Sequence, residues 1–175
     1  MQIETERLVL RKPRLDDVDD FLEFAGDDEV MRWIAGVAGD RAATVELLER
    51  WIARWERDDV GQFVVLLDGH AIGRVGLLVW NTSTWETSSY AEAAEHAQPE
   101  LGWAFTRRFW GHGYATEAAR AAREWAYADR AVERLISLIA PDNARSICVA
   151  EKLGATREQT ISTFHGPANV WMYPR

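Results

Sequence analysis

The chain has 175 residues, and 47% of them are hydrophobic, so we expect one globular domain over residues 1–175. Its formal charge of −8 argues against nonspecific nucleic-acid binding, which depends on clustered Lys and Arg. Cys148 is the only cysteine, which excludes an intramolecular disulfide and a cysteine metal cluster. The chain opens with charged residues and carries no apolar run of about 18 residues, so we expect a cytoplasmic protein that binds no membrane.

The N-terminal part predicts a strand followed by helices. Residues 5–12 have the apolar pattern of a strand, and residues 18–25 carry apolar side chains at helical spacing. Residues 41–58 show the clearest helical period, with Trp51 and Trp55 on the apolar side. Apolar stripes of this kind usually pack in a core.

A hairpin is predicted next. The Asp68-Gly69 pair separates apolar runs at residues 63–67 and 71–80, and Asp-Gly is a strong hairpin signal. Residues 81–99 then interrupt the pattern. Their first half is rich in Ser and Thr and reads as a loop, whereas residues 90–96 could form about two helical turns.

The central stretch is residues 100–123, in which a short apolar run leads through two glycines into an alanine-rich helical segment. A strand that feeds a helix through a glycine turn leaves the first backbone N–H groups of the helix without partners. Donors and helix dipole together favour an anion at that place. Gly111 and Gly113 let the backbone approach such a ligand closely. We expect the amides of residues 110–116 to form the anion site.

Known motifs narrow the identity of this anion. The dinucleotide fingerprint lacks its third glycine because Thr116 stands there, and the P-loop pattern is absent. The segment WGHGYATEA resembles the cofactor turn of the GNAT superfamily of N-acetyltransferases, whose pattern is [QR]-x-x-G-x-[GA]. Gly113 and Ala115 fit the pattern, and Trp110 replaces the Gln or Arg, as in the branch resembling the ribosomal-protein N-terminal (Rim-type) acetyltransferases. A ligand-free turn is the alternative.

The C-terminal part predicts a buried strand, a helix and two closing strands. Residues 135–140 form a continuous apolar run, and a helix separates them from the run at 101–105, so we expect a parallel pair with a right-handed crossover. A helix should start near Asn143 and stop at Gly154, before strands at 156–163 and 169–173.

This helix carries the second part of the resemblance. Asn143, Ser146 and the segment EKLGA resemble the GNAT pattern N-x-x-[AS]-x-x-x-x-E-K-L-G-F. The resemblance implies an α+β fold. Its largely antiparallel sheet of six to seven strands would hold one central parallel pair, with helices on both faces.

The resemblance also implies a cosubstrate, acetyl-CoA, and a set of residues that bind it. The pantetheine arm would pair with the strand edge, and the diphosphate would lie on the turn. The implied cofactor-binding residues are Ala104, Phe105, Arg108, Gly111, His112, Gly113, Tyr114, Ala115, Thr116 and Asn143. Backbone N–H groups near Phe105 would polarise the thioester carbonyl.

Acetyl transfer to an amine also needs a base and a proton for the leaving thiolate. Glu100 is the candidate base, directly or through water, and a solvated glutamate at a strand end is the alternative. The family's usual tyrosine is replaced by Ala150, so Ser146 is the candidate acid, or only a cofactor contact. Cys148 should be a core residue and not a nucleophile.

The predicted function is acetyl-CoA-dependent N-acetylation of a primary amine, either a small molecule or a protein N terminus. A catalytically inactive acyl-CoA-binding or regulatory module is the alternative. Trp85 and Tyr90 are candidate acceptor contacts, unless residues 81–99 are only a surface insertion. No His spacing predicts a metal site, and the nine tryptophans are compatible with a homodimer.

Overall fold

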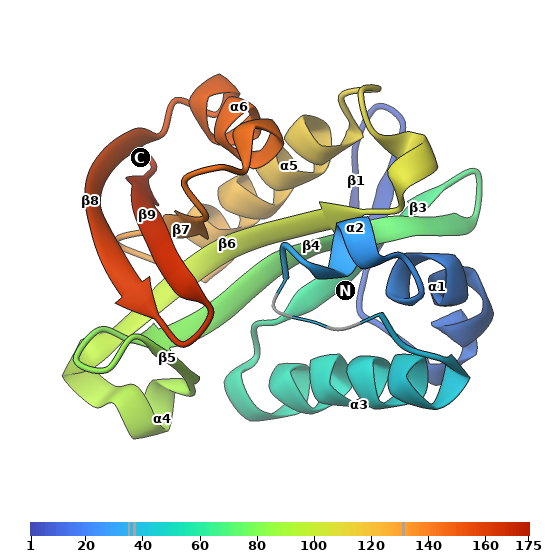
Figure 1. Ribbon diagram of the computed structural model, residues 1–175, viewed down its shortest axis with the longest axis horizontal. Coiled ribbons are helices and arrows are strands. Elements are labelled where there is room, and N and C mark those ends of the chain that lie inside the picture. The colour runs from blue at the N-terminus through green and yellow to red at the C-terminus, as the bar shows by residue number, and fades with distance from the viewer. Residues whose placement is uncertain (35, 37, 131) are drawn as a thin grey trace. The chain divides into compact units, whose positions relative to one another are not determined.

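The computed structural model describes residues 1–34, 36, 38–130 and 132–175 (Figure 1). They form two compact units. The first unit comprises Met1–Gly76 and Trp103–Ala121, and the second comprises Leu77–Gly102 and Ala122–Arg175. The expectation of a single acetyltransferase domain stays a prediction. No helix among the described residues is both long and apolar enough to span a bilayer.

Antiparallel strands form the sheet of the first unit. Their bounds are β1 (Gln2–Glu4), β2 (Val9–Arg11), β3 (Gln62–Leu67) and β4 (His70–Asn81), of which β4 continues into the second unit. The β3–β4 hairpin is confirmed, and its turn residues Asp68 and Gly69 both have positive φ, 50° and 86°. The single strand predicted over residues 5–12 is wrong at its start, because Thr5 N–H donates to the Leu8 carbonyl and turns the chain there.

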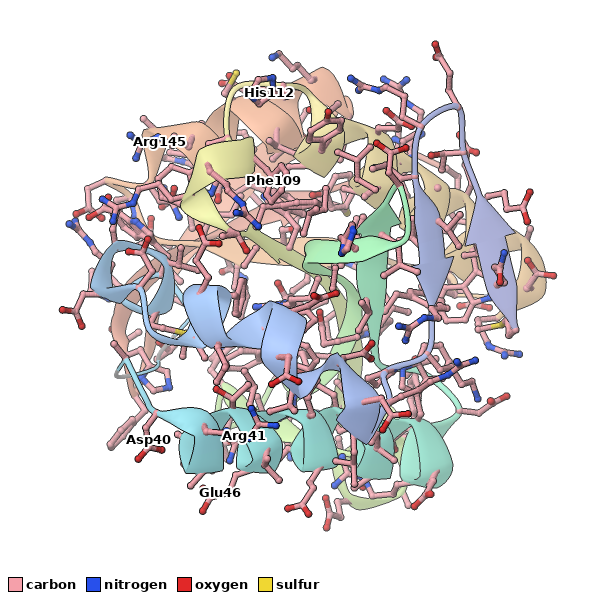
Figure 2. The ribbon with its side chains drawn as sticks, turned by 90° about the vertical axis from the view of Figure 1, so that its right-hand side faces the viewer. Asp40, Arg41, Glu46, Phe109, His112 and Arg145 are labelled. Carbon is pink, nitrogen blue, oxygen red and sulfur yellow. The ribbon has the colours of Figure 1, made fainter. Side chains whose placement is uncertain are left out.

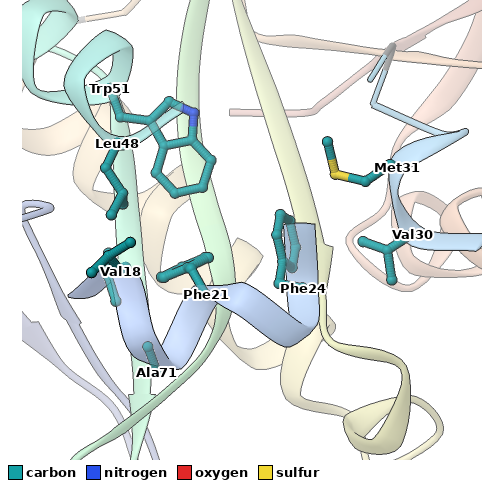
Figure 3. Close-up of a cluster of buried hydrophobic side chains, with 9 residues drawn as sticks. Val18, Phe21, Phe24, Val30, Met31, Leu48, Trp51 and Ala71 are labelled. Carbon is teal, nitrogen blue, oxygen red and sulfur yellow. The ribbon is translucent and has the colours of Figure 1, made fainter. Parts of the chain in front are cut away.

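Helices cover this sheet. They are the short 3₁₀ helix η1 (Leu15–Asp17), α1 (Val18–Ala25), α2 (Asp28–Met31) and α3 (Arg41–Asp58). Figure 3 shows the core cluster that they form: Val18, Phe21, Phe24, Val30, Met31, Leu48, Trp51, Val64 and Ala71. The Trp51 ring packs edge-on against Phe21, with centroids 5.3 Å apart. Trp51 is therefore a core residue, as its helical stripe indicates.

The second unit is built around a parallel strand pair. Its elements are β5 (Glu86–Ser88), α4 (Tyr90–Ala93), η2 (Ala94–His96), β6 (Ala97–Phe105), β7 (Ile136–Ile139), α6 (Ala144–Lys152), β8 (Thr156–Thr163) and β9 (Gly166–Met172). The end of β6 belongs to the first unit, and α5 (Tyr114–Asp129) begins there. Strand β7 pairs in parallel with β6, with Glu100 opposite Ile136, and antiparallel with β9.

The fold is thus α+β, with a mostly antiparallel sheet and one parallel pair, as expected. Three details differ from the sequence-based expectation. The described residues form nine strands, β1 to β9, where six to seven were expected. Residues 86–88 of the expected loop form β5 because they pair with β4. Cys148 is exposed and is not a core residue.

Candidate functional site

The glycine turn lies between η3 (Arg107–Phe109) and α5, in the first unit. Gly111 and Gly113 have φ values of 82° and 83°, a region that other residues adopt only with strain. An added Cβ at Gly111 would meet nothing within 4 Å. Gly111 therefore presents its backbone to open space, whereas a Cβ at Gly113 would lie 3.5 Å from Nη2 of Arg7.

The backbone amides of this turn are the main feature of the site. Across the described part of the chain, the N–H groups of residues 111–116 donate to no carbonyl and to no side chain. Gly113 also has no side chain with which to cap α5. Six consecutive donors at the positive end of a 16-residue helix thus remain available to an anion. The Trp110 amide is not among them, since it donates to the Arg107 carbonyl at 3.1 Å.

Trp110 anchors the turn to the body of the first unit. Its indole Nε1–H donates to the Phe105 carbonyl at 2.7 Å, and its ring packs against the core cluster. A Gln or Arg at this position could not pack against apolar side chains in the same way. This contact accounts for the tryptophan at the position where the GNAT pattern has Gln or Arg.

An ion pair that sequence analysis missed braces the other side of the turn. The Arg7 side chain contacts Glu117, in the first turn of α5, with Nε to Oε2 at 2.7 Å, and its Nη1 donates to the His112 carbonyl at 3.1 Å. Thr5 Oγ1 donates to the same carboxylate at 2.6 Å. No local pattern could have revealed a pair separated by 110 positions.

This pairing keeps Glu117 charged. Burial acts to raise the pKa of Glu117, but the hydrogen bonds from Thr5 and from the backbone and side chain of Arg7 outweigh it. The pKa of the carboxyl therefore lies below its ordinary value. Its negative charge is matched by the guanidinium of Arg7.

Cationic and aromatic side chains surround the turn. Arg108 lies 3.3 Å from a carboxylate oxygen of Glu23, and Arg107 lies 2.9 Å from Asp27. These four side chains, with Leu22 and Gly26, line an open pocket of about 590 Å³. Figure 2 shows Phe109 and His112 on the turn, and the His112 ring stacks on Tyr114 with centroids 5.7 Å apart. Of the two predicted cofactor contacts, His112 thus belongs to the turn, and Arg108 lies in η3 and pairs with Glu23.

Ala104 and Phe105, predicted to hold the pantetheine arm, end β6 in the first unit. Ala104 packs against the core cluster, and Phe105 is buried. The Phe105 carbonyl already accepts from Trp110, and the Thr106 N–H donates to the Ile72 carbonyl at 2.9 Å. Pairing with pantetheine would therefore fall to other groups of this strand end.

The candidate base, Glu100, lies in the second unit. It is only 6% exposed, so a solvated position is wrong for this carboxylate. One residue further along β6, the Leu101 carbonyl accepts a hydrogen bond from the Ser137 hydroxyl of β7. A buried carboxylate is uncommon in a sheet and often marks a functional site.

Tyr173 is a second feature that sequence analysis missed. Its hydroxyl lies 2.7 Å from the Ser137 hydroxyl. Burial raises the pKa of Tyr173 far above its ordinary value, the bond with Ser137 acts the other way, and the negative charge of Glu100 raises it further. Tyr173 therefore stays protonated at neutral pH.

Asn143 and Ser146 come together at the start of α6. The Asn143 side-chain oxygen accepts from the Ser146 N–H at 3.2 Å, which makes Asn143 the N-cap of the helix. The cap uses the oxygen of the Asn143 amide, so contact with pantetheine would depend on its NH₂ group. Trp85 precedes β5 with φ of 57°, and Tyr90 begins α4, and both are half-buried.

The candidate residues thus divide into two sets. The turn, Arg108, Ala104 and Phe105 belong to the first unit, and Glu100, Asn143, Ser146, Trp85 and Tyr90 to the second. Within the described residues, no group of three or more His, Cys, Asp or Glu side chains could hold a metal ion. The roles of all these residues, and the absence of a metal, stay predictions.

Comparison with known proteins finds a matching family model, a sequence relative and similar structures. The model of the acetyltransferase (GNAT) domain matches residues 7–156. The uncharacterized protein YkkB of Bacillus subtilis strain 168 is 30% identical, over 97% of this chain and 94% of that protein. The crystal structure of the acetyltransferase from Agrobacterium tumefaciens strain C58 has a TM-score of 0.78 and 26% identity, covering 100% of this chain and 95% of that one.

Two more distant structures share the fold. A putative ribosomal-protein-serine acetyltransferase from Vibrio cholerae has a TM-score of 0.76 and 20% identity, covering 99% of this chain and 98% of that one. The aminoglycoside acetyltransferase AAC(6')-Ib, solved in complex with coenzyme A, has a TM-score of 0.75 and 21% identity, covering 96% of this chain and 95% of that one. At these identities the likeness is one of fold.

Proposed function

The chain belongs to the GNAT family of acetyltransferases, and on that premise we propose that it transfers the acetyl group of acetyl-CoA directly to a primary amine. The observation that carries the proposal is the run of unpaired amides at residues 111–116, at the start of α5. In the alternative of a ligand-free turn, water would satisfy these exposed and half-buried donors.

The diphosphate of acetyl-CoA fits this turn by charge and by shape. Hydrogen bonds to a charged group contribute about 1.5–3 kcal/mol each, so a few such bonds provide micromolar affinity. The left-handed Gly111 and Gly113 add no side chains to the turn. Arg108, in η3, and His112, on the turn, are the proposed further contacts.

In the proposed reaction the amine nitrogen attacks the thioester carbonyl carbon, the C–S bond breaks, and the amine loses a proton. Glu100 takes that proton, directly or through water, because it is a buried carboxylate on β6. Ser146 supplies a proton or a hydrogen bond to the leaving thiolate. Tyr173 holds its proton too tightly to act as the base.

The acceptor is a small amine or a protein N terminus. An α-amine, with a pKa of about 7.7–8.0, is partly neutral at pH 7, whereas a lysine with a pKa of about 10.4 is almost fully charged. The acidic net charge of −8 supports a cationic acceptor. Trp85 and Tyr90 are its proposed contacts.

The test is a screen of amines, peptides and aminoglycosides for mass gain of one acetyl group, with release of the CoA thiol followed in parallel. Glu100→Gln should lower kcat about 100-fold at neutral pH and leave acetyl-CoA affinity within twofold. The deficit should shrink as pH approaches the acceptor pKa, because the amine then loses its proton unaided. Glu46→Gln, an exposed glutamate on α3, is the control.

The outcomes separate the alternatives. Unchanged kcat in Glu100→Gln would remove Glu100 from the mechanism. Binding of acetyl-CoA with no acetylated amine across the screen would favour the inactive acyl-CoA-binding module. Failure of the wild-type protein to bind acetyl-CoA would overturn the proposed function itself.

A further inference from the structure

Arg7 lies in the turn between β1 and β2, far from the glycine turn in sequence, yet it contacts the start of α5 at several points. Its Nε and Nη2 reach one oxygen of Glu117 at 2.7 and 2.6 Å, and its backbone N–H reaches the other at 2.9 Å. Its Nη1 donates to the His112 carbonyl at 3.1 Å, and its guanidinium lies 4.6 Å from the centre of the Tyr114 ring.

The bond to His112 determines where the next amide points. The carbonyl of His112 and the N–H of Gly113 belong to one planar trans peptide, in which the two groups point in opposite directions. By holding the carbonyl, Arg7 directs the Gly113 N–H away from its own guanidinium. Glycine at position 113 permits more than one orientation of this peptide, so the bond from Arg7 restricts it.

The ion pair with Arg7 neutralises the negative charge of Glu117 at the start of α5. A carboxylate in the first turn of α5 would repel a diphosphate bound at the same helix start. The guanidinium of Arg7 and the hydroxyl of Thr5 engage that carboxylate within the first unit. The two charges therefore compensate each other, and the field of the free amides remains positive.

We propose that Arg7 is a positioning residue of the acetyl-CoA site: it orients the His112–Gly113 peptide and neutralises Glu117, so that the turn accepts the diphosphate. The inference rests on the proposed function and adds to it a residue outside both motifs. Lysine should replace Arg7 poorly, because a single ammonium lacks the planar fork that reaches two partners at once.

The experiment is calorimetric titration of acetyl-CoA into the wild-type protein and three variants: Arg7→Lys, Arg7→Gln and Arg7→Gln/Glu117→Gln. Arg7→Gln should weaken binding about 10-fold, and Arg7→Lys about threefold. The double variant should regain about threefold over Arg7→Gln, because it no longer carries an uncompensated carboxylate. A residue that only stabilises the fold would not produce this rescue.

Arg41→Gln is the matched control. Arg41 forms an exposed ion pair with Asp19, and Figure 2 shows it on α3, away from His112. Its loss should leave acetyl-CoA affinity unchanged. Thermal unfolding of every variant checks that the fold is intact. If Arg7→Gln is unfolded, the acetyl-CoA affinity of Arg7→Lys alone tests the role of Arg7.

Two results would overturn the inference about Arg7 and leave the proposed function intact. One is an acetyl-CoA affinity of Arg7→Gln within twofold of wild type, and the other is a double variant that binds acetyl-CoA no better than Arg7→Gln. If Arg7→Lys has to decide, wild-type affinity in that variant overturns it. A wild-type protein that does not bind acetyl-CoA removes the proposed function, and this inference with it.

Discussion

The starts of α3 and α5, both in the first unit, differ in whether their first backbone N–H groups have a hydrogen-bond partner; Figure 2 labels residues at both starts. At α3, the Asp40 carboxylate accepts from the Ala43 N–H at 3.1 Å, so the helix carries its own anion. At α5, Gly113 stands before the helix and offers no side chain, and the first amides have no partner in the described residues.

The difference separates a structural helix start from a candidate binding site. Helix α6 follows the α3 pattern, since Asn143 caps it. A side-chain cap contributes about 1 kcal/mol to stability, which α5 forgoes. Burial of Ala118, Ala119, Ala122 and Ala126 holds α5 in place instead, so its first amides remain available to a ligand.

The largest expected effect comes from making α5 resemble α3. Gly113→Asp would add a carboxylate at the start of α5, with its Cβ 3.5 Å from Nη2 of Arg7, where its negative charge would repel the diphosphate. We expect acetyl-CoA affinity to fall at least about 100-fold, equal to about 2.7 kcal/mol, as measured by calorimetric titration. Aspartate is among the residues that tolerate positive φ best, so the fold should survive.

Gly69→Asp is the control, because Gly69 has a φ of 86°, open space around it and a place in the β3–β4 hairpin. Its acetyl-CoA affinity should match wild type. If Gly113→Asp binds acetyl-CoA as tightly as wild type, the start of α5 is not the binding site that distinguishes it from the start of α3.

Asn143 allows capping to be separated from ligand contact. Asn143→Ala should lower the free energy of unfolding by about 1 kcal/mol, because the cap on Ser146 N–H is lost. Asn143→Asp keeps the capping oxygen and should preserve stability, yet it lacks the NH₂ group proposed to contact pantetheine. We therefore expect both variants to bind acetyl-CoA about fivefold more weakly. Urea denaturation and calorimetric titration measure the two quantities.

Asp40→Ala is the reference for a cap without a ligand role. It should lose about 1 kcal/mol of stability and keep its acetyl-CoA affinity. If Asn143→Asp also keeps full affinity, Asn143 is a cap only.

The smallest expected effect is on the pH dependence of stability. Because the folded-state pKa of Glu117 lies below its ordinary value of 4.5, its contribution is complete above that value and is lost as pH falls towards the folded-state pKa. Glu117→Gln should therefore flatten the fall in Tm on acidification below about pH 4.5, and Glu46→Gln should not. A Glu117→Gln protein as acid-sensitive as wild type would contradict this account.

Features with a local signal were predictable. The apolar period of residues 41–58 gave α3 with its bounds, the Asp68-Gly69 pair gave the hairpin turn, and the helix between two apolar runs predicted the parallel pairing of β6 with β7. The glycine turn was readable for the same reason, because its positive φ values restrict which residues can stand there.

By itself, then, the sequence determined the order of the elements, the family and the place of the turn, since period, turn chemistry and motif spacing all act between near neighbours. Only the tertiary structure decided what surrounds the candidate groups. Arg7 meets Glu117 across 110 positions, and Tyr173 meets Ser137 across 36, because folding and not spacing brings them together. The sequence also left open whether Glu100 is a base or a solvated glutamate at a strand end, and only the structure shows that it is buried: burial depends on every element packed around a residue, and no local pattern contains that information.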